Sequence, residues 1–107
     1  MITATTDTLT GYEITESLGL VRGNTIRARH IGRDIIAAFK NIVGGEISDY
    51  TKLMGESREQ SLDRMIAEAE RLGADAVVAI RFTTSTLMGG AAELLAYGTA
   101  VRVQKQT

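Results

Sequence analysis

The chain has 107 residues, of which 44% are hydrophobic and 23% charged, and its formal net charge is −1 at pH 7. This length and composition predict one folded domain over residues 1–107, and they exclude a multidomain enzyme and a disordered chain. There is no cysteine and only one histidine, which excludes disulfide frameworks, thiol catalysis and zinc ribbons.

The N-terminal part of the chain predicts β-structure. Residues 1–6 are rich in threonine and are followed by Asp7 and Gly11, which is typical of an edge strand or arm. From residue 12 to residue 29, apolar and polar positions mix with β-branched residues, which predicts one long strand. We expect this strand to bend or bulge at two glycines, Gly19 and Gly23.

A first helix is predicted after this strand. Apolar residues recur at helical spacing across residues 31–42, which gives a helix of about three turns. Gly44 and Gly45 follow it and are interpreted as a glycine C-cap. The same glycines could cradle a phosphate, but no glycine-rich phosphate motif surrounds them, so the cap is the better interpretation.

A second, longer helix is predicted over residues 48–72. Ser48 offers its N-cap and Gly73 ends it. One apolar stripe follows the helix, while charged residues occupy the opposite side. Gly55 lies inside the helix and is a candidate kink.

Beyond this helix the apolar period changes from 3.6 to 2, which predicts a strand over residues 76–86. In that strand we expect Val78, Ile80 and Phe82 to share one face. A turn over residues 87–90 then predicts a hairpin, because its glycines supply positive φ angles.

The final strand is predicted over residues 93–103. One of its faces carries Ala96, Gly98 and Ala100, and such a flat face accepts a helix or another backbone closely. The order of strand, helices and hairpin predicts a two-layer α+β fold with an antiparallel sheet and helices on one face. A three-stranded sheet of this kind leaves an edge and a face exposed, which favours oligomerisation.

No arrangement of residues indicates nucleophilic catalysis, because the single histidine has no nucleophile motif beside it. A cluster of arginines, Arg27, Arg29 and Arg33, surrounds the start of the first helix. Guanidinium groups and helix amides there would suit a phosphate or carboxylate. The alternative interpretation, which we favour, is a set of salt bridges to the acidic long helix of a neighbouring subunit.

His30 and Asp34 are four residues apart, a spacing that can place two metal ligands on one helix face. The neighbouring arginines would repel a cation, so we favour a histidine paired with the carboxylate at the junction of strand and helix. No cofactor is indicated by the sequence.

The balanced charge and the few aromatic residues argue against nucleic-acid binding. The longest apolar runs are of the size found in protein cores, far below the roughly 18 residues that a membrane helix requires. The N-terminus lacks the basic and apolar regions of a signal peptide. We therefore expect a cytoplasmic protein without a membrane or nucleic-acid partner.

Several sequence blocks carry a resemblance that spans essentially the whole chain: RHIGRDI at 29–35, NIVGGE at 41–46, Tyr50, Arg58, LGADAVV at 72–78 and YGTAV at 97–101. The chain resembles the YbjQ-like family of small bacterial and archaeal proteins. The resemblance implies a dodecin-like β-α-β-β protomer with central strand order 1-3-2. It also implies a ring-shaped homopentamer in which short extra strands, here residues 2–6, help to join subunits.

The family is commonly labelled heavy-metal binding. Soft heavy metals prefer thiolate ligands, and this chain has none. The residues matching the family gather around the first helix and its exit, which is where we expect any shared ligand site: Arg33, Asp34, Gly44, Gly45 and Tyr50.

These patterns lead to one preferred function and two alternatives. We expect a non-enzymatic homo-oligomer that binds a partner or a small ligand at subunit boundaries. The first alternative is a metal-binding protein that uses His30 and Asp34. The second is an enzyme whose site lies between subunits and uses Arg33, Asp34 and Tyr50.

Overall fold

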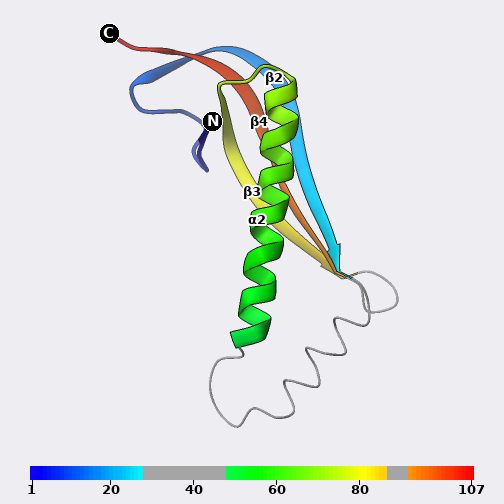
Figure 1. Cartoon of the computed structure of the whole chain (residues 1–107). Coiled ribbons are helices and arrows are strands. Elements are labelled where there is room, and N and C mark those ends of the chain that lie inside the picture. The colour runs from blue at the N-terminus through cyan, green and yellow to red at the C-terminus, as the bar shows by residue number, and fades with distance from the viewer. Residues whose placement is uncertain (28–47, 87–91) are drawn as a thin grey trace.

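The computed structural model describes residues 1–27, 48–86 and 92–107 (Figure 1). The predicted first helix at 31–42 and the predicted turn at 87–90 lie outside these residues. The described elements, in chain order, are β1 (Ile2–Thr3), β2 (Tyr12–Arg27), α2 (Ser48–Arg71), β3 (Ala76–Thr86) and β4 (Ala92–Lys105). The α2 helix is not long and apolar enough to cross a membrane.

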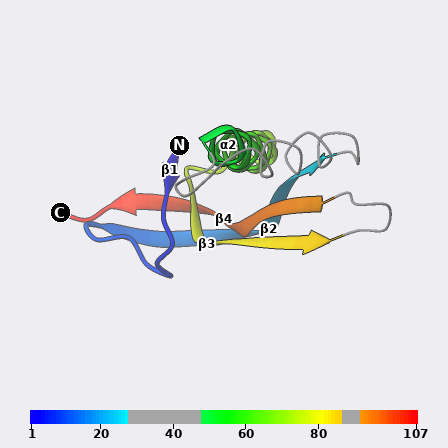
Figure 2. The same cartoon turned by 90° about the horizontal axis from the view of Figure 1, so that it is seen from below.

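The strands form one sheet in the order β1-β3-β4-β2. β4 pairs antiparallel with both β2 and β3, whereas β1 pairs parallel with β3. The expectation of a three-stranded antiparallel sheet is therefore corrected to a four-stranded mixed sheet, and the α+β class is confirmed. After the N-terminal segment, which lies beside β3, the chain passes through residues 7–11 to the opposite edge of the sheet, where β2 begins (Figure 2).

The N-terminal segment runs along β3 of its own chain. The Ala4 amide donates to the Val77 carbonyl at 3.0 Å, and the Ile80 amide donates to the Ala4 carbonyl at 3.1 Å. The Ala79 amide donates to the Thr6 carbonyl at 2.9 Å. The prediction of an edge strand is confirmed. These bonds occupy the side of residues 2–6 that faces β3, and the contribution of this segment to subunit contacts stays a prediction.

The α2 helix covers one face of the sheet, above β2 and β4 (Figure 2). Met65 and Ala69 of the helix pack on Ala96 and Ala100, so the flat face of the final strand accepts a helix as predicted. The helix begins at Ser48 as predicted and continues through Gly55. It ends at Arg71, one residue before the expected position, and Gly73 follows with a φ of 77°.

The long strand β2 is irregular at one of the two expected glycines. Its pairing with β4 shifts register between Ser17 and Gly19, and Gly19 has a φ of 112°. At Gly23 the register is continuous, so the expected bulge is wrong there. Gly23 instead lies directly beneath α2, where a Cβ atom would collide with the helix backbone at Ser61 and Met65.

A bulge also interrupts β3, at Ala79, whose φ is 55°. Val78 pairs with Thr99 and Arg81 with Tyr97, so two residues of β3 oppose one residue of β4. The bulge reverses the alternation of side chains. Ile80 consequently joins the core beneath α2, whereas Val78 belongs to a separate cluster with Val101, and the predicted shared face is wrong.

Candidate functional site

The structure leaves the sequence-predicted ligand site largely outside the described residues. This is true of Arg29, Arg33, Asp34, Gly44 and Gly45, and of His30 in the metal alternative. The two remaining members are the last residue of β2, Arg27, and a residue in the first turn of α2, Tyr50. Both the anion site and the metal pair therefore stay predictions.

Within residues 1–27, 48–86 and 92–107, no group of three or more histidine, cysteine, aspartate or glutamate side chains could hold a metal ion. The acidic residues in these ranges are spread over β2, α2 and β4, with Asp7 and Asp75 in the connections between elements.

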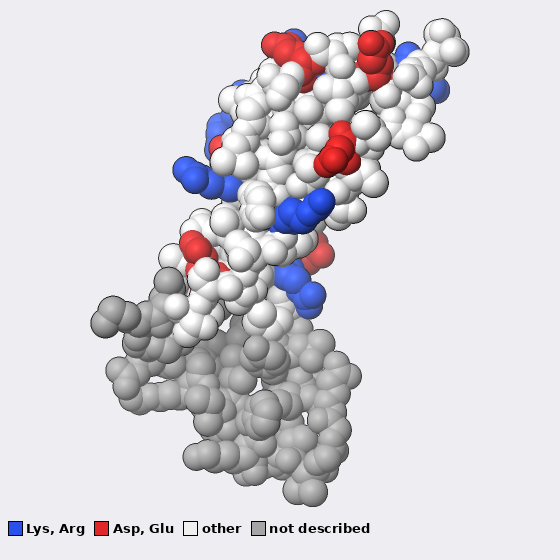
Figure 3. All heavy atoms as spheres, turned by 180° about the vertical axis from the view of Figure 1, so that it is seen from behind, with Lys and Arg blue, Asp and Glu red and all other residues white. Residues whose placement is uncertain are grey.

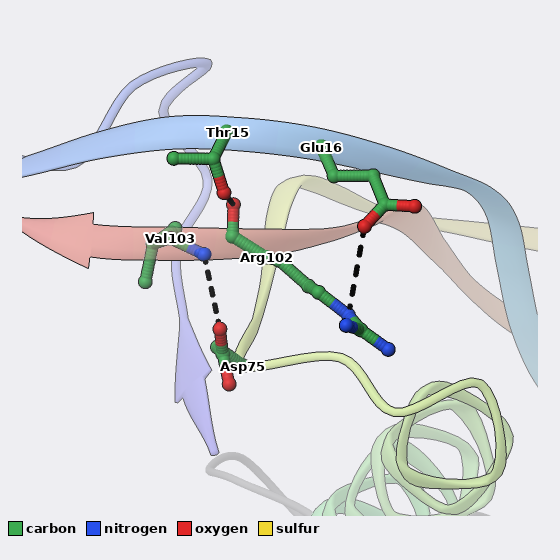
Figure 4. Close-up of polar contacts among 5 residues, drawn as sticks. All are labelled: Thr15, Glu16, Asp75, Arg102 and Val103. Carbon is green, nitrogen blue, oxygen red and sulfur yellow. Dashed lines mark hydrogen bonds and ion pairs between the residues drawn. The ribbon is translucent and has the colours of Figure 1, made fainter.

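Five residues form polar contacts where β2, β4 and the α2–β3 connection meet (Figure 4). The Arg102 Nε lies 3.7 Å from the Glu16 carboxylate, and both side chains are about half exposed. The Val103 amide donates to the Asp75 carboxylate at 3.1 Å, and the Thr15 hydroxyl donates to the Arg102 carbonyl at 3.3 Å. These contacts hold the α2–β3 connection and β2 against β4, so we interpret them as structural. The exposed ion pair itself contributes little to the free energy of folding.

Three buried hydroxyl groups lie between α2 and the sheet. Ser61 Oγ donates to the Leu94 carbonyl at 2.9 Å and lies 3.3 Å from Thr25 Oγ1. Thr25 Oγ1 lies 3.5 Å from the carbonyl of Ser57, which is also buried. No basic side chain takes part in these contacts, so they fix the helix on the sheet rather than forming a nucleophilic site.

A polar hollow of about 340 Å³ lies beside β2 and β4. The Asn24 amide donates to the Glu93 carboxylate at 3.0 Å, and the Arg64 guanidinium donates to the Asn24 carbonyl. Arg22 and Glu68 complete the polar lining. One cation, two carboxylates and an amide could bind a small polar molecule. The sequence signal for this hollow is weak, because its lining comes from three elements that are distant in the chain: β2, α2 and β4.

An apolar groove of about 440 Å³ lies between the N-terminal segment and α2. Leu62 of the helix and Ile80 and Phe82 of β3 line it, together with residues 3–6. Phe82 is 44% exposed, which is unusual for so large an apolar side chain. The sequence pattern does not predict this groove, because it places Phe82 in the core, on one face with Val78 and Ile80.

Comparisons with known proteins place these features in context. The family model YbjQ_1, described as "Putative heavy-metal-binding", matches residues 1–104. A UPF0145 protein of Archaeoglobus fulgidus is 60% identical over 104 residues, covering 97% of this chain and 96% of the relative. A UPF0145 protein of Methanosarcina acetivorans is 54% identical over 106 residues, covering 99% of this chain and all of the relative.

A solved structure has a similar fold. It is a crystal structure from Pediococcus pentosaceus, of a protein with unknown function in the DUF74 family. Its TM-score is 0.63 at 15% identity, and the match covers 97% of this chain and 98% of the other. At this identity the likeness shows the fold alone.

Proposed function

The chain belongs to the YbjQ family of UPF0145 proteins, and we propose that it is a self-assembling, non-enzymatic domain that binds a partner or small ligand at subunit boundaries. We propose further that the assembly is the dodecin-like, ring-shaped homopentamer that the family resemblance implies, and that it works in the cytoplasm. The observation that carries this proposal is the large surface of the single chain.

The isolated chain exposes more surface than a compact monomer of its size. Its accessible surface is 7127 Å², against about 5,800 Å² expected for a folded monomer of 11.5 kDa. Its radius of gyration is 17.3 Å, where a compact domain of this length has about 13 Å. The excess surface is larger than the roughly 800 Å² that each partner buries in a standard interface. Assembly would remove this excess from water.

Exposed apolar side chains support the same proposal. Leu20 and Ile26 lie on the edge strand β2 and are 61% and 57% exposed. Phe82 lies on β3, toward the opposite edge of the sheet, and is also exposed. On the face turned away from α2, most of the described surface is uncharged. The charged side chains on this face lie apart from one another and form no single patch (Figure 3). A surface of this kind favours burial against a similar surface over contact with nucleic acid.

A ring is favoured over a two-fold dimer because the two edges of the sheet differ. β2 forms one edge, whereas β1 lies beside β3 at the other edge. Contact between unlike surfaces is heterologous, and heterologous contacts close into rings or continue as filaments.

The family description keeps a metal-binding function as the second candidate. Its ligands in this chain would be His30 and Asp34, because cysteine is absent. Isothermal titration calorimetry with a divalent metal tests this metal-binding function. If the double variant His30→Ala with Asp34→Ala binds the metal as tightly as the wild type, these residues are not the site.

The proposed function is tested by native mass spectrometry of protein purified without added metal or chelator. We expect one closed assembly of about five chains, because that stoichiometry follows from the family resemblance. A retained small-molecule or metal mass would identify the ligand class, whereas a bare ring would direct the search to protein partners. A spectrum that contains only single chains at micromolar concentration would refute the proposal.

A further inference from the structure

The polar hollow beside β2 has the size of a small-molecule site. Its volume of about 340 Å³ lies within the range of ligand pockets in proteins and far exceeds the roughly 30 Å³ that one water molecule takes up. Since β2 is an edge strand, the hollow lies near an edge of the sheet. Three elements form its walls: β2 with Arg22 and Asn24, β4 with Glu93 and Leu95, and α2 with Glu68.

Hydrogen bonds hold part of this hollow in place. The side-chain amide of Asn24 donates to the Glu93 carboxylate at 3.0 Å, and the Arg64 guanidinium donates to the backbone carbonyl of Asn24. An ionised carboxylate accepts several hydrogen bonds, so Glu93 keeps acceptor positions for a ligand. The Glu93 carboxylate is therefore oriented before any ligand binds, which lowers the entropy cost of binding.

The charged groups of the lining have no charged partner in the described part of the chain. Among residues 1–27, 48–86 and 92–107, the one ion pair joins Arg102 to Glu16, neither of which lines the hollow. Glu68 and Glu93 are partly buried, whereas Arg22 is exposed. An opposite charge stabilises a partly buried charge more than a fully solvated one. A ligand with matching charges would thus gain free energy at all three groups.

The charges of the lining distinguish between ligand classes. Two carboxylates repel a phosphate or a nucleotide, and the guanidinium repels a metal ion. A diamine would leave Arg22 without a partner, and an amino acid with one ammonium group would leave one carboxylate without a partner. A diamino carboxylic acid carries two ammonium groups and one carboxylate, so it matches all three charges. Its methylene chain would pack on Leu95, which is partly buried.

We propose that the hollow binds a free diamino carboxylic acid, the class to which lysine belongs. The Arg22 guanidinium binds the ligand's carboxylate through its paired N–H groups. Glu68 and Glu93 each bind one ammonium group, and the Asn24 amide holds the second of these carboxylates in position. This inference rests on the proposed function, in which the chain binds a small ligand, and it names the class of that ligand.

Isothermal titration calorimetry of the wild type with L-lysine tests the ligand class. L-Norleucine is the matched probe, because it lacks only the terminal ammonium group, and 1,5-diaminopentane lacks only the carboxylate. We expect each to bind at least tenfold more weakly than L-lysine, since each leaves a charge of the hollow unpaired.

Nα-Acetyl-L-lysine distinguishes the free amino acid from a lysine at the C-terminus of a protein, because both of the latter lack the α-ammonium group. We expect it to bind at least tenfold more weakly than L-lysine. Equal affinity would overturn the assignment to a free diamino acid and would indicate a protein C-terminus instead.

Three variants place the site. Glu68→Gln and Glu93→Gln should each weaken the binding of L-lysine at least tenfold, and Arg22→Gln should do so without weakening the binding of 1,5-diaminopentane. Glu70→Gln is the matched control, because Glu70 is exposed on the same helix and does not line the hollow. It should bind L-lysine like the wild type.

Two results would overturn this inference: a wild type that L-lysine does not saturate at millimolar concentration, or L-lysine binding that Glu68→Gln and Glu93→Gln leave unchanged. The comparison of ligands on the wild type needs no substitution, so it decides the matter if a variant fails to fold. Native mass spectrometry of the same samples tests the proposed assembly separately. A closed assembly that does not bind L-lysine leaves the assembly standing, whereas single chains refute the assembly whether or not L-lysine binds.

Discussion

Gly23 lies where the helix and the sheet come closest. A Cβ atom there would meet the backbone of Ser61 and Met65 and would lie 2.7 Å from the Cβ of Arg64. The opposing helix positions are small or flexible: Ser57 and Ser61 are buried there, and Met65 fills the remaining space. The absence of a side chain at one strand position thus sets the separation of the two layers.

The variant Gly23→Ala should lower the free energy of unfolding by about 1–3 kcal/mol, because the new methyl group collides with backbone that cannot rotate away. Gly55→Ala is the control. Its Cβ meets nothing within 4 Å, and alanine inside a helix should raise the free energy of unfolding by about 0.5–1 kcal/mol. Denaturant titration of both variants at one protein concentration measures the difference. Equal denaturation midpoints for the two variants would show that the helix and the sheet move apart to accept the new methyl group.

In the pair of strands β3 and β4, a single bulge changes which side chains face the helix. The bulge at Ala79 places Val77 and Ile80 beneath α2, although their separation of three residues would put them on opposite faces of a regular strand. Gly98 of β4 lies opposite this bulge. A Cβ there would lie 2.8 Å from Val77 Cγ1 and 3.0 Å from the Val78 carbonyl oxygen.

The variant Gly98→Val should therefore destabilise the fold by about 1–3 kcal/mol, through overpacking against the bulged strand. Thr83→Val serves as a control, because it places the same side chain at an exposed strand position, where the effect should stay within about 0.5 kcal/mol. Thermal unfolding of the two variants provides the comparison. An unchanged melting temperature for Gly98→Val would mean that the bulge adjusts without cost.

The whole molecule is long and thin. Its principal extents are 57 × 28 × 16 Å, and one core cluster lies beneath α2 while a second lies on the other face of the sheet. Leu9 and Ile14 pack against the second cluster, together with Ile2 and Val103. That cluster covers only part of the face, and Leu20 and Ile26 stay exposed beyond it. The proposed assembly would cover these side chains and thereby stabilise the fold.

The melting temperature should accordingly rise with protein concentration. Assembly couples to folding by mass action, which gives an increase of about 3–8 °C for each tenfold rise in concentration for a chain of this size. Differential scanning calorimetry over two decades of concentration measures it. A melting temperature independent of concentration in the wild type would argue against coupled assembly.

Local sequence patterns predict most of the described elements. Period and caps placed the long helix within one residue of its observed end, and the flat face of Ala96 and Ala100 predicted where it packs. These features follow from local rules, because spacing along the chain dictates which side chains share a face. For the candidate site, the sequence named residues between Arg27 and Tyr50, and apart from these two all of them lie outside the described residues.

The partners of each element depend on contacts between distant parts of the chain. The parallel β1–β3 pair joins residues more than seventy positions apart, and the apolar groove combines side chains from the N-terminus, α2 and β3. The bulge at Ala79 also has no local signal, since alanine rarely adopts a positive φ and does so here where its amide donates to Thr6. Long-range contacts select such features, because their energy depends on neighbours that are distant in sequence.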